Sequence, residues 1–138
     1  MSKKVQEAMS PNPRTVSRSD TVVSAALVME EEDVGSLPVV DHGFPVGIVT
    51  DRDITIRVVA QRKDPNTITV GEIASDDLHY VTPDQDLDEA LEVMAYRQVR
   101  RLLVVDDDQL VGILAQADVV HEVKDKKAGQ LVEQISQT

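Results

Sequence analysis

Residues 34–54 read VGSLPVVDHGFPVGIVTDRDI, and this stretch predicts two strands followed by a helix. Two short aliphatic runs, residues 37–40 and 46–49, flank a segment of turn-forming residues, an order that predicts a β-hairpin. Pro38 has no backbone N–H to donate to a neighbouring strand, so it marks an edge strand or a strand start. The polar residues after Thr50 then favour the beginning of a helix.

Helices are predicted on both sides of this hairpin. On its N-terminal side, Ser19 or Asp20 can cap a helix whose apolar stripe ends near Gly35. On its C-terminal side, the apolar spacing after Thr50 continues the second helix to about Arg62, where polar residues break it. With a short strand before the first helix, the predicted order is strand, helix, strand, strand, helix.

The same pattern occurs twice in the chain. Residues 5–55 align without a gap with residues 70–120, and most of the identical pairs are apolar. These pairs include Val16/Val81, Ala25/Ala90, Met29/Met94, Leu37/Leu102, Val39/Val104, Gly47/Gly112 and Asp53/Asp118. The two halves are therefore copies of one unit.

The duplication sets the expected domain boundaries. We predict a first repeat over residues 1–62, a linker over 63–69, a second repeat over 70–123 and a C-terminal tail over 124–138. A three-stranded unit of this size buries too little surface alone, so two β-α-β-β-α repeats related by a pseudo-twofold axis are expected to share a core. The predicted fold class is α/β (α+β), with a cleft between the repeats.

Composition narrows the range of functions. The chain has 138 residues, no cysteine, three aromatic side chains and a net charge of -11. This charge and the scarcity of stacking residues argue against a nucleic-acid partner. The missing cysteines, the absence of an apolar signal core and the lack of a long apolar stretch favour a cytoplasmic protein with no membrane contact.

Motifs for catalysis and metal binding are absent from the sequence. The three histidines have no ligand spacing, and the acidic run at residues 106–108 is typical of a solvated turn. No nucleophile elbow, Ser-His-Asp order or phosphate-binding loop occurs. We therefore expect no enzyme activity, no metal site and no obligatory cofactor.

The duplicated stretches resemble the CBS domain family, named after cystathionine β-synthase, whose tandem pairs form a Bateman module. Residues 9–16, 34–41 and 47–54 carry this resemblance, which extends over roughly residues 5–123. Residues 50–73 also resemble the short two-CBS proteins called hypoxic response proteins. The resemblance implies a regulatory homodimer that binds AMP, ATP, S-adenosylmethionine or a similar ligand between its repeats, with an unidentified protein partner.

The family motif Gly-h-h-Ser/Thr-x-x-Asp binds ribose and phosphate, and it maps here onto Gly47, Thr50 and Asp53. The Asp53 carboxylate is suited to accept both hydroxyl groups of a ribose, and Thr50 to donate to a phosphate at the first turn of a helix. Arg52 can add positive charge. The same spacing is also that of a capping box, and the two roles are compatible.

The second repeat departs from the motif. It keeps Asp118 but has Ala115 where the hydroxyl belongs, so we expect one ligand per chain, near Thr50. Arg100 and Arg101 take the places of small residues in the first repeat and are predicted to reach a phosphate across the cleft. The alternative for both arginines is a solvated basic strip.

The adenine is expected to lie against apolar side chains and backbone amides. The family pattern assigns this contact to Val16, Ser36, Leu37 and Pro38, although simple core packing explains the same residues. A rival function is a structural dimerisation adaptor with a vestigial cleft and no ligand. The dimer is expected to use apolar residues of the long helices, namely Val22, Val23, Ala26, Leu27, Leu87, Ala90, Leu91 and Met94.

Overall fold

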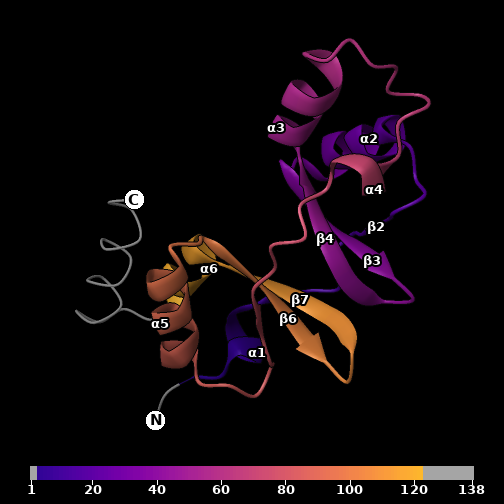
Figure 1. Cartoon of the computed structure of the whole chain (residues 1–138). Coiled ribbons are helices and arrows are strands. Elements are labelled where there is room, and N and C mark those ends of the chain that lie inside the picture. The colour runs from indigo at the N-terminus through magenta and orange to yellow at the C-terminus, as the bar shows by residue number, and fades with distance from the viewer. Residues whose placement is uncertain (1–2, 123–138) are drawn as a thin grey trace. The chain divides into compact units, whose positions relative to one another are not determined.

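The computed structural model describes residues 3–122, which form two compact units (Figure 1). Residues 14–78 make up one of them, called here the central unit. Residues 3–13 combine with residues 79–122 to make the other, called the terminal unit. The predicted tail over residues 124–138 lies outside the described residues.

The central unit contains a three-stranded sheet in the order β2-β3-β4. Strand β2 pairs with β3 in parallel, and β3 pairs with β4 in antiparallel fashion. Its elements are β2 (Val16–Ser17), α2 (Val22–Glu32), β3 (Ser36–Asp41), β4 (Phe44–Thr50), α3 (Asp51–Ile54), the π-helix η1 (Thr55–Val59) and α4 (Val70–Ile73).

The terminal unit contains a four-stranded sheet in the order β1-β7-β6-β5. The short β1 pairs with β7 in antiparallel fashion, and β5 pairs with β6 in parallel. Its elements are α1 (Val5–Ala8), β1 (Ser10–Pro11), β5 (Tyr80–Val81), α5 (Leu87–Arg97), β6 (Arg101–Asp106), β7 (Gln109–Ala115) and α6 (Gln116–Glu122). The predicted α/β fold class with two strand-helix-strand-strand-helix copies is confirmed.

Both predicted hairpins turn through two residues. The turn between β3 and β4 has positive φ at His42 and Gly43, and the turn between β6 and β7 has positive φ at Asp107 and Asp108. Two consecutive left-handed residues match the twist of the flanking strands. The first turn is tighter than the five-residue segment expected from the sequence, because β4 already begins at Phe44.

The start of α2 differs from the prediction. Thr21, not Ser19 or Asp20, is the N-cap residue, and its Oγ1 accepts a hydrogen bond of 3.1 Å from the Ser24 amide. The Asp20 carboxylate instead accepts from the Ser17 amide at 2.8 Å, which closes the turn before the helix. Asp20 is thus a turn residue, because its side chain bonds backwards along the chain.

Pro38 lies inside β3, which is the middle strand of the sheet, so it marks neither an edge strand nor a strand start. It faces Ile48 of β4, whereas the pairing of β3 with β2 takes in only Val39 and Val40. Pro38 therefore occupies the part of β3 beyond the paired residues of β2, which is where a residue without an N–H is tolerated.

The compact units do not coincide with the sequence repeats, because the repeats exchange their N-terminal helices. Helix α1 precedes the first repeat's strands but packs in the terminal unit, where the Val5 amide donates to the Gln85 carbonyl at 2.9 Å. Helix α4, its aligned copy, packs in the central unit, where the Val70 amide donates to the Asp20 carbonyl at 2.8 Å. These two hydrogen bonds are equivalent, because Val5 aligns with Val70 and Gln85 aligns with Asp20.

Each unit has its own aliphatic core. The central core gathers residues of β2, α2, β3, β4, η1 and α4, and the terminal core gathers residues of α1, β5, α5, β6, β7 and α6. The four α5 residues assigned to a dimer interface, Leu87, Ala90, Leu91 and Met94, are fully buried in the terminal core. That assignment is therefore wrong for α5, because its apolar stripe is used within the unit. It is also wrong for Val22 of α2, which is buried in the central core.

Candidate functional site

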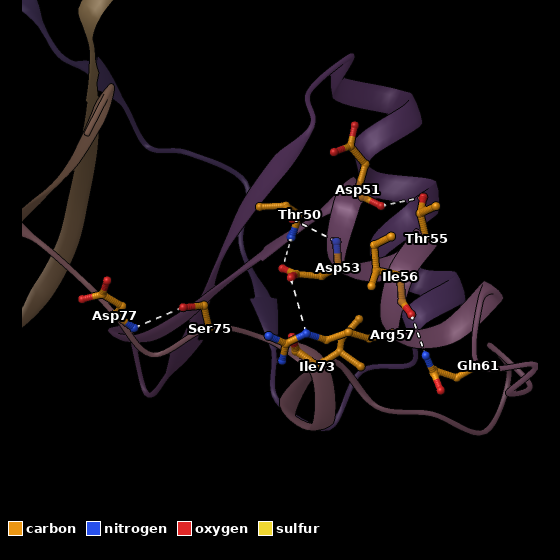
Figure 2. Close-up of polar contacts among 10 residues, drawn as sticks. All are labelled: Thr50, Asp51, Asp53, Thr55, Ile56, Arg57, Gln61, Ile73, Ser75 and Asp77. Atoms are coloured by element: carbon orange, nitrogen blue, oxygen red, sulfur yellow. Dashed lines mark hydrogen bonds and ion pairs between the residues drawn. The ribbon is translucent and has the colours of Figure 1, made fainter. Parts of the chain in front are cut away.

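The junction between β4 and α3 carries the predicted motif residues Thr50 and Asp53. The Thr50 amide donates to Asp53 Oδ2 at 2.9 Å, and the Asp53 amide donates to Thr50 Oγ1 at 3.1 Å, as Figure 2 shows. This reciprocal capping box satisfies two amides that the first turn would leave unpaired. Within residues 3–122 the hydroxyl proton of Thr50 is not used in a hydrogen bond, so it is available to a ligand.

The motif glycine has a structural role in this unit. Ile48 exchanges two backbone hydrogen bonds of 2.8 and 2.9 Å with Ser75, which follows α4. A Cβ added at Gly47 would lie 3.0 Å from the Ser75 carbonyl oxygen, closer than real Cβ atoms normally come. Gly47 thus allows the backbone after α4 to approach β4 closely.

Arg57 is a residue of this site that the sequence reasoning missed. Its Nε lies 3.9 Å from Asp53 Oδ1, and one of its terminal nitrogens donates to the Ile73 carbonyl at 3.3 Å (Figure 2). The signal was present as the i,i+4 spacing of an acid and a base on a predicted helix. The predicted Arg52 is exposed, and its guanidinium has no hydrogen bond or ion pair with any of residues 3–122.

The residues predicted to contact adenine fall into two groups. Ser36 is half-buried and lies opposite Thr50 in the β3–β4 ladder, so the structure brings these two together. Val16 and Leu37 are buried in the central core at 4% and 2% exposure, and Pro38 is buried too. Core packing thus accounts for these three, and their contact with adenine stays a prediction.

The candidate residues of the second repeat all lie in the terminal unit. The Arg100 carbonyl accepts from the Gln116 amide at 2.9 Å, and Arg101 lies opposite Ala115 in the β6–β7 ladder. Both arginines are exposed, whereas Asp118 is half-buried in the first turn of α6. A role for Arg100 or Arg101 in binding phosphate stays a prediction.

A surface hollow of about 310 Å³ lies between η1 and α4 in the central unit. Its walls are apolar, with charged groups from Arg57, Lys63 and Glu72. Glu72 belongs to a second capping box, where its carboxylate accepts from the Thr69 amide at 2.7 Å and from the Thr69 hydroxyl at 3.0 Å. These two hydrogen bonds hold the pKa of Glu72 below its usual value, with a smaller contribution from Lys63.

Residues 3–122 contain neither a metal-binding cluster nor a membrane-spanning helix. No group of three or more His, Asp or Glu side chains in this part of the chain is arranged to hold a metal ion. None of its helices has both the length and the apolar character needed to cross a membrane.

Comparison with known proteins matches both repeats. A family model for the CBS domain matches residues 5–60 and again residues 70–125. The CBS domain-containing protein YhcV of Bacillus subtilis is 39% identical over 133 residues, which cover 96% of this chain and 94% of that protein. Hypoxic response protein 1 of Mycobacterium tuberculosis is 37% identical over 131 residues, which cover 94% and 92%.

Solved structures share the fold as well. The crystal structure of Hypoxic Response Protein I with two coordinated zinc ions has a TM-score of 0.78 and covers 88% of this chain and 99% of that one. The crystal structure of CBSX2 in complex with AMP has a TM-score of 0.71 at 29% identity and covers 86% of this chain and 94% of that one.

Proposed function

Because the chain belongs to the CBS domain family and carries two copies of that domain, we propose that it is a non-enzymatic regulatory module that binds an adenine nucleotide at Thr50 and Asp53. The observation that carries the proposal is the geometry of the capping box. It fixes both side chains while leaving the Thr50 hydroxyl proton to donate and Asp53 Oδ1 to accept. The AMP complex of CBSX2 supports the choice of ligand class.

The two groups match two parts of a nucleotide. A ribose offers two neighbouring hydroxyl donors, and the Asp53 carboxylate has acceptor capacity beyond its one bond to the Thr50 amide. A phosphate offers acceptor oxygens to the Thr50 hydroxyl. Ala115 stands at the aligned position of the second repeat and has no hydroxyl to donate, so we expect one nucleotide per chain.

The test is a thermal-shift and calorimetry screen with AMP, ADP, ATP, S-adenosylmethionine and NADH, with GMP as a base control. Ligand at a hundred times its Kd adds about 2.7 kcal/mol of stability, so the Tm should rise by on the order of 10 °C. Asp53→Asn keeps an oxygen for the Thr50 amide but loses acceptor capacity and charge, so the rise should disappear. Asp118→Asn is the matched control and should keep it.

Two results would contradict the proposal. A wild-type protein whose Tm no adenine nucleotide raises does not bind this class of ligand. An Asp53→Asn variant that responds as strongly as the wild type binds its nucleotide elsewhere. Two equal sites per chain in the titration would contradict the stoichiometry alone.

A second candidate function is a dimerisation adaptor without a ligand. The observation in its favour is Leu27, a large apolar side chain of α2 that is 53% exposed. An adaptor would form dimers and give no response to any nucleotide, whereas the regulatory module responds to a nucleotide whether or not it is dimeric.

A further inference from the structure

Arg57 links two elements that contribute to the candidate site. Its Nε faces Asp53 Oδ1 at 3.9 Å, while its terminal nitrogen donates to the carbonyl of Ile73 at 3.3 Å. Ile73 is the last residue of α4, so its carbonyl has no amide partner further along that helix. One guanidinium thus bonds the end of α4 and faces the carboxylate at the start of α3 (Figure 2).

The two oxygens of the Asp53 carboxylate have different roles in the capping box. Oδ2 is occupied by the Thr50 amide at 2.9 Å, so Oδ1 is the oxygen best placed to accept a hydroxyl group. The Asp53 side chain is 17% exposed, and the Arg57 side chain is 55% exposed. At 3.9 Å the guanidinium attracts Oδ1 without occupying it in a hydrogen bond, so Oδ1 keeps its acceptor capacity.

The second repeat lacks this arrangement. The residue aligned with Arg57 is Glu122, so the acid Asp118 is followed four positions later by another acid. The backbone differs too, because residues 116–122 are α-helical throughout, whereas the aligned segment changes to a π-helix at Thr55. Together with Ala115, these differences confine the complete set of groups to the first repeat.

We propose that Arg57 is a positioning residue that holds the Asp53 carboxylate for the hydroxyl groups of a ribose and couples that carboxylate to α4. The proposal rests on the proposed function for its ligand. It acts through Asp53, so its effect depends on the ribose and not on the number of phosphates. A nucleotide bound at Asp53 then stabilises α4 through the same guanidinium.

The experiment compares Arg57→Ala, Arg57→Lys, Asp53→Asn and the double variant Asp53→Asn/Arg57→Ala with the wild type. Arg62→Ala is the matched control, because Arg62 is an exposed arginine just after η1 whose side chain has no hydrogen bond or ion pair within residues 3–122. AMP and 2′,3′-dideoxy-AMP are titrated by calorimetry. Hydrogen exchange of the amide of Ala74, which directly follows α4 and donates to the Val70 carbonyl, is measured without ligand.

Arg57→Ala should weaken AMP binding by about three- to tenfold, the size of a coupling between neighbouring charged groups, and leave dideoxy-AMP unchanged. Arg57→Lys should recover part of the loss, and the double variant should bind AMP no more weakly than Asp53→Asn. The Ala74 amide should exchange its hydrogen faster in Arg57→Ala than in the wild type, and at the wild-type rate in Arg62→Ala.

The outcomes separate this proposal from the proposed function. Equal losses for AMP and dideoxy-AMP would mean that Arg57 contacts the phosphate or base directly, which overturns positioning through Asp53. Unchanged AMP binding overturns it too. A wild type that binds no nucleotide rejects the positioning role along with the proposed function, and unchanged Ala74 exchange in Arg57→Ala overturns the link to α4 in either case.

Discussion

At the residue scale, Thr50 serves the fold and the candidate site with different parts of one hydroxyl group. Its oxygen accepts the Asp53 amide at 3.1 Å, while its proton stays available. The aligned Ala115 of the terminal unit has the same position, between β7 and α6, and offers no acceptor for the first turn. The two repeats therefore allow a paired test of the cap.

We expect Thr50→Ala to lower the free energy of unfolding by about 1 kcal/mol, the usual loss when an N-cap oxygen is removed. Ala115→Thr should raise it by up to about 1 kcal/mol, because it supplies that oxygen three residues before Asp118. Urea unfolding measures both changes, and Thr50→Ser is the control that keeps the oxygen. A Thr50→Ala protein as stable as the wild type would show that the cap contributes nothing.

The sequence alone predicts some residues of the candidate site correctly and misses others. Thr50 and Asp53 follow from their spacing alone, because a capping box is a local feature of the backbone. The motif also predicts Arg52, but successive residues on a helix point about 100° apart, so Arg52 faces away from its neighbour Asp53. Arg57 stands one turn later on the same side as Asp53, and its second partner, Ile73, is distant in sequence.

At the element scale, α1 and α4 are helices of four residues each, too short to be stable alone. Each is stabilised by a box at its N-terminus, in which a Glu side chain accepts from the N-cap backbone amide. Thr69 and Glu72 have the spacing of a capping box, whereas Lys4 has no side-chain acceptor and does not fit that signature. The sequence does not show the unit against which either helix packs. That partner is set by tertiary contacts, such as the approach of Ser75 to Gly47.

The box of α4 predicts a dependence on pH. The pKa of Glu72 is lowered from 4.5 by the Thr69 amide and hydroxyl, so ionised Glu72 stabilises the fold above pH 4.5 and loses this contribution as the pH falls through its folded-state pKa. Glu72→Gln keeps an acceptor but does not ionise. We expect the wild type to be more stable than this variant at pH 7 and the difference to shrink towards zero below pH 4.5.

Urea unfolding over this pH range measures the difference. Glu30→Gln on α2 is the control for a generic loss of a negative charge, since Glu30 is exposed and its carboxylate makes no hydrogen bond within residues 3–122. The prediction would be contradicted if the difference in free energy of unfolding between Glu72→Gln and the wild type stayed constant from neutral to acid pH.

At the scale of the whole molecule, the homodimer stays a prediction, and the burial of each predicted interface residue decides which variant can test it. Leu91 is fully buried, so Leu91→Glu would disrupt the terminal core and report nothing about an interface. Leu27 is exposed on α2 and is the better probe. We expect Leu27→Glu to raise the dimer dissociation constant at least about tenfold, because a charge replaces an apolar contact.

Sedimentation at micromolar concentration measures this effect. Val34→Glu is the matched control, because Val34 is 42% exposed and lies beyond the end of α2. A wild-type monomer, or a dimer that Leu27→Glu leaves intact, would contradict the predicted interface.

The exchange of α1 and α4 between the repeats has a consequence for protein synthesis. The central unit is one continuous stretch, residues 14–78, so all of its contacts are available as soon as that stretch has left the ribosome. Residues 3–13 emerge earlier, but their partners lie beyond residue 78, and closing so long a loop is slower than forming local contacts. We therefore expect residues 14–78 to fold first during translation. Residues 3–13 can pack only after the strands beyond residue 78 have been translated.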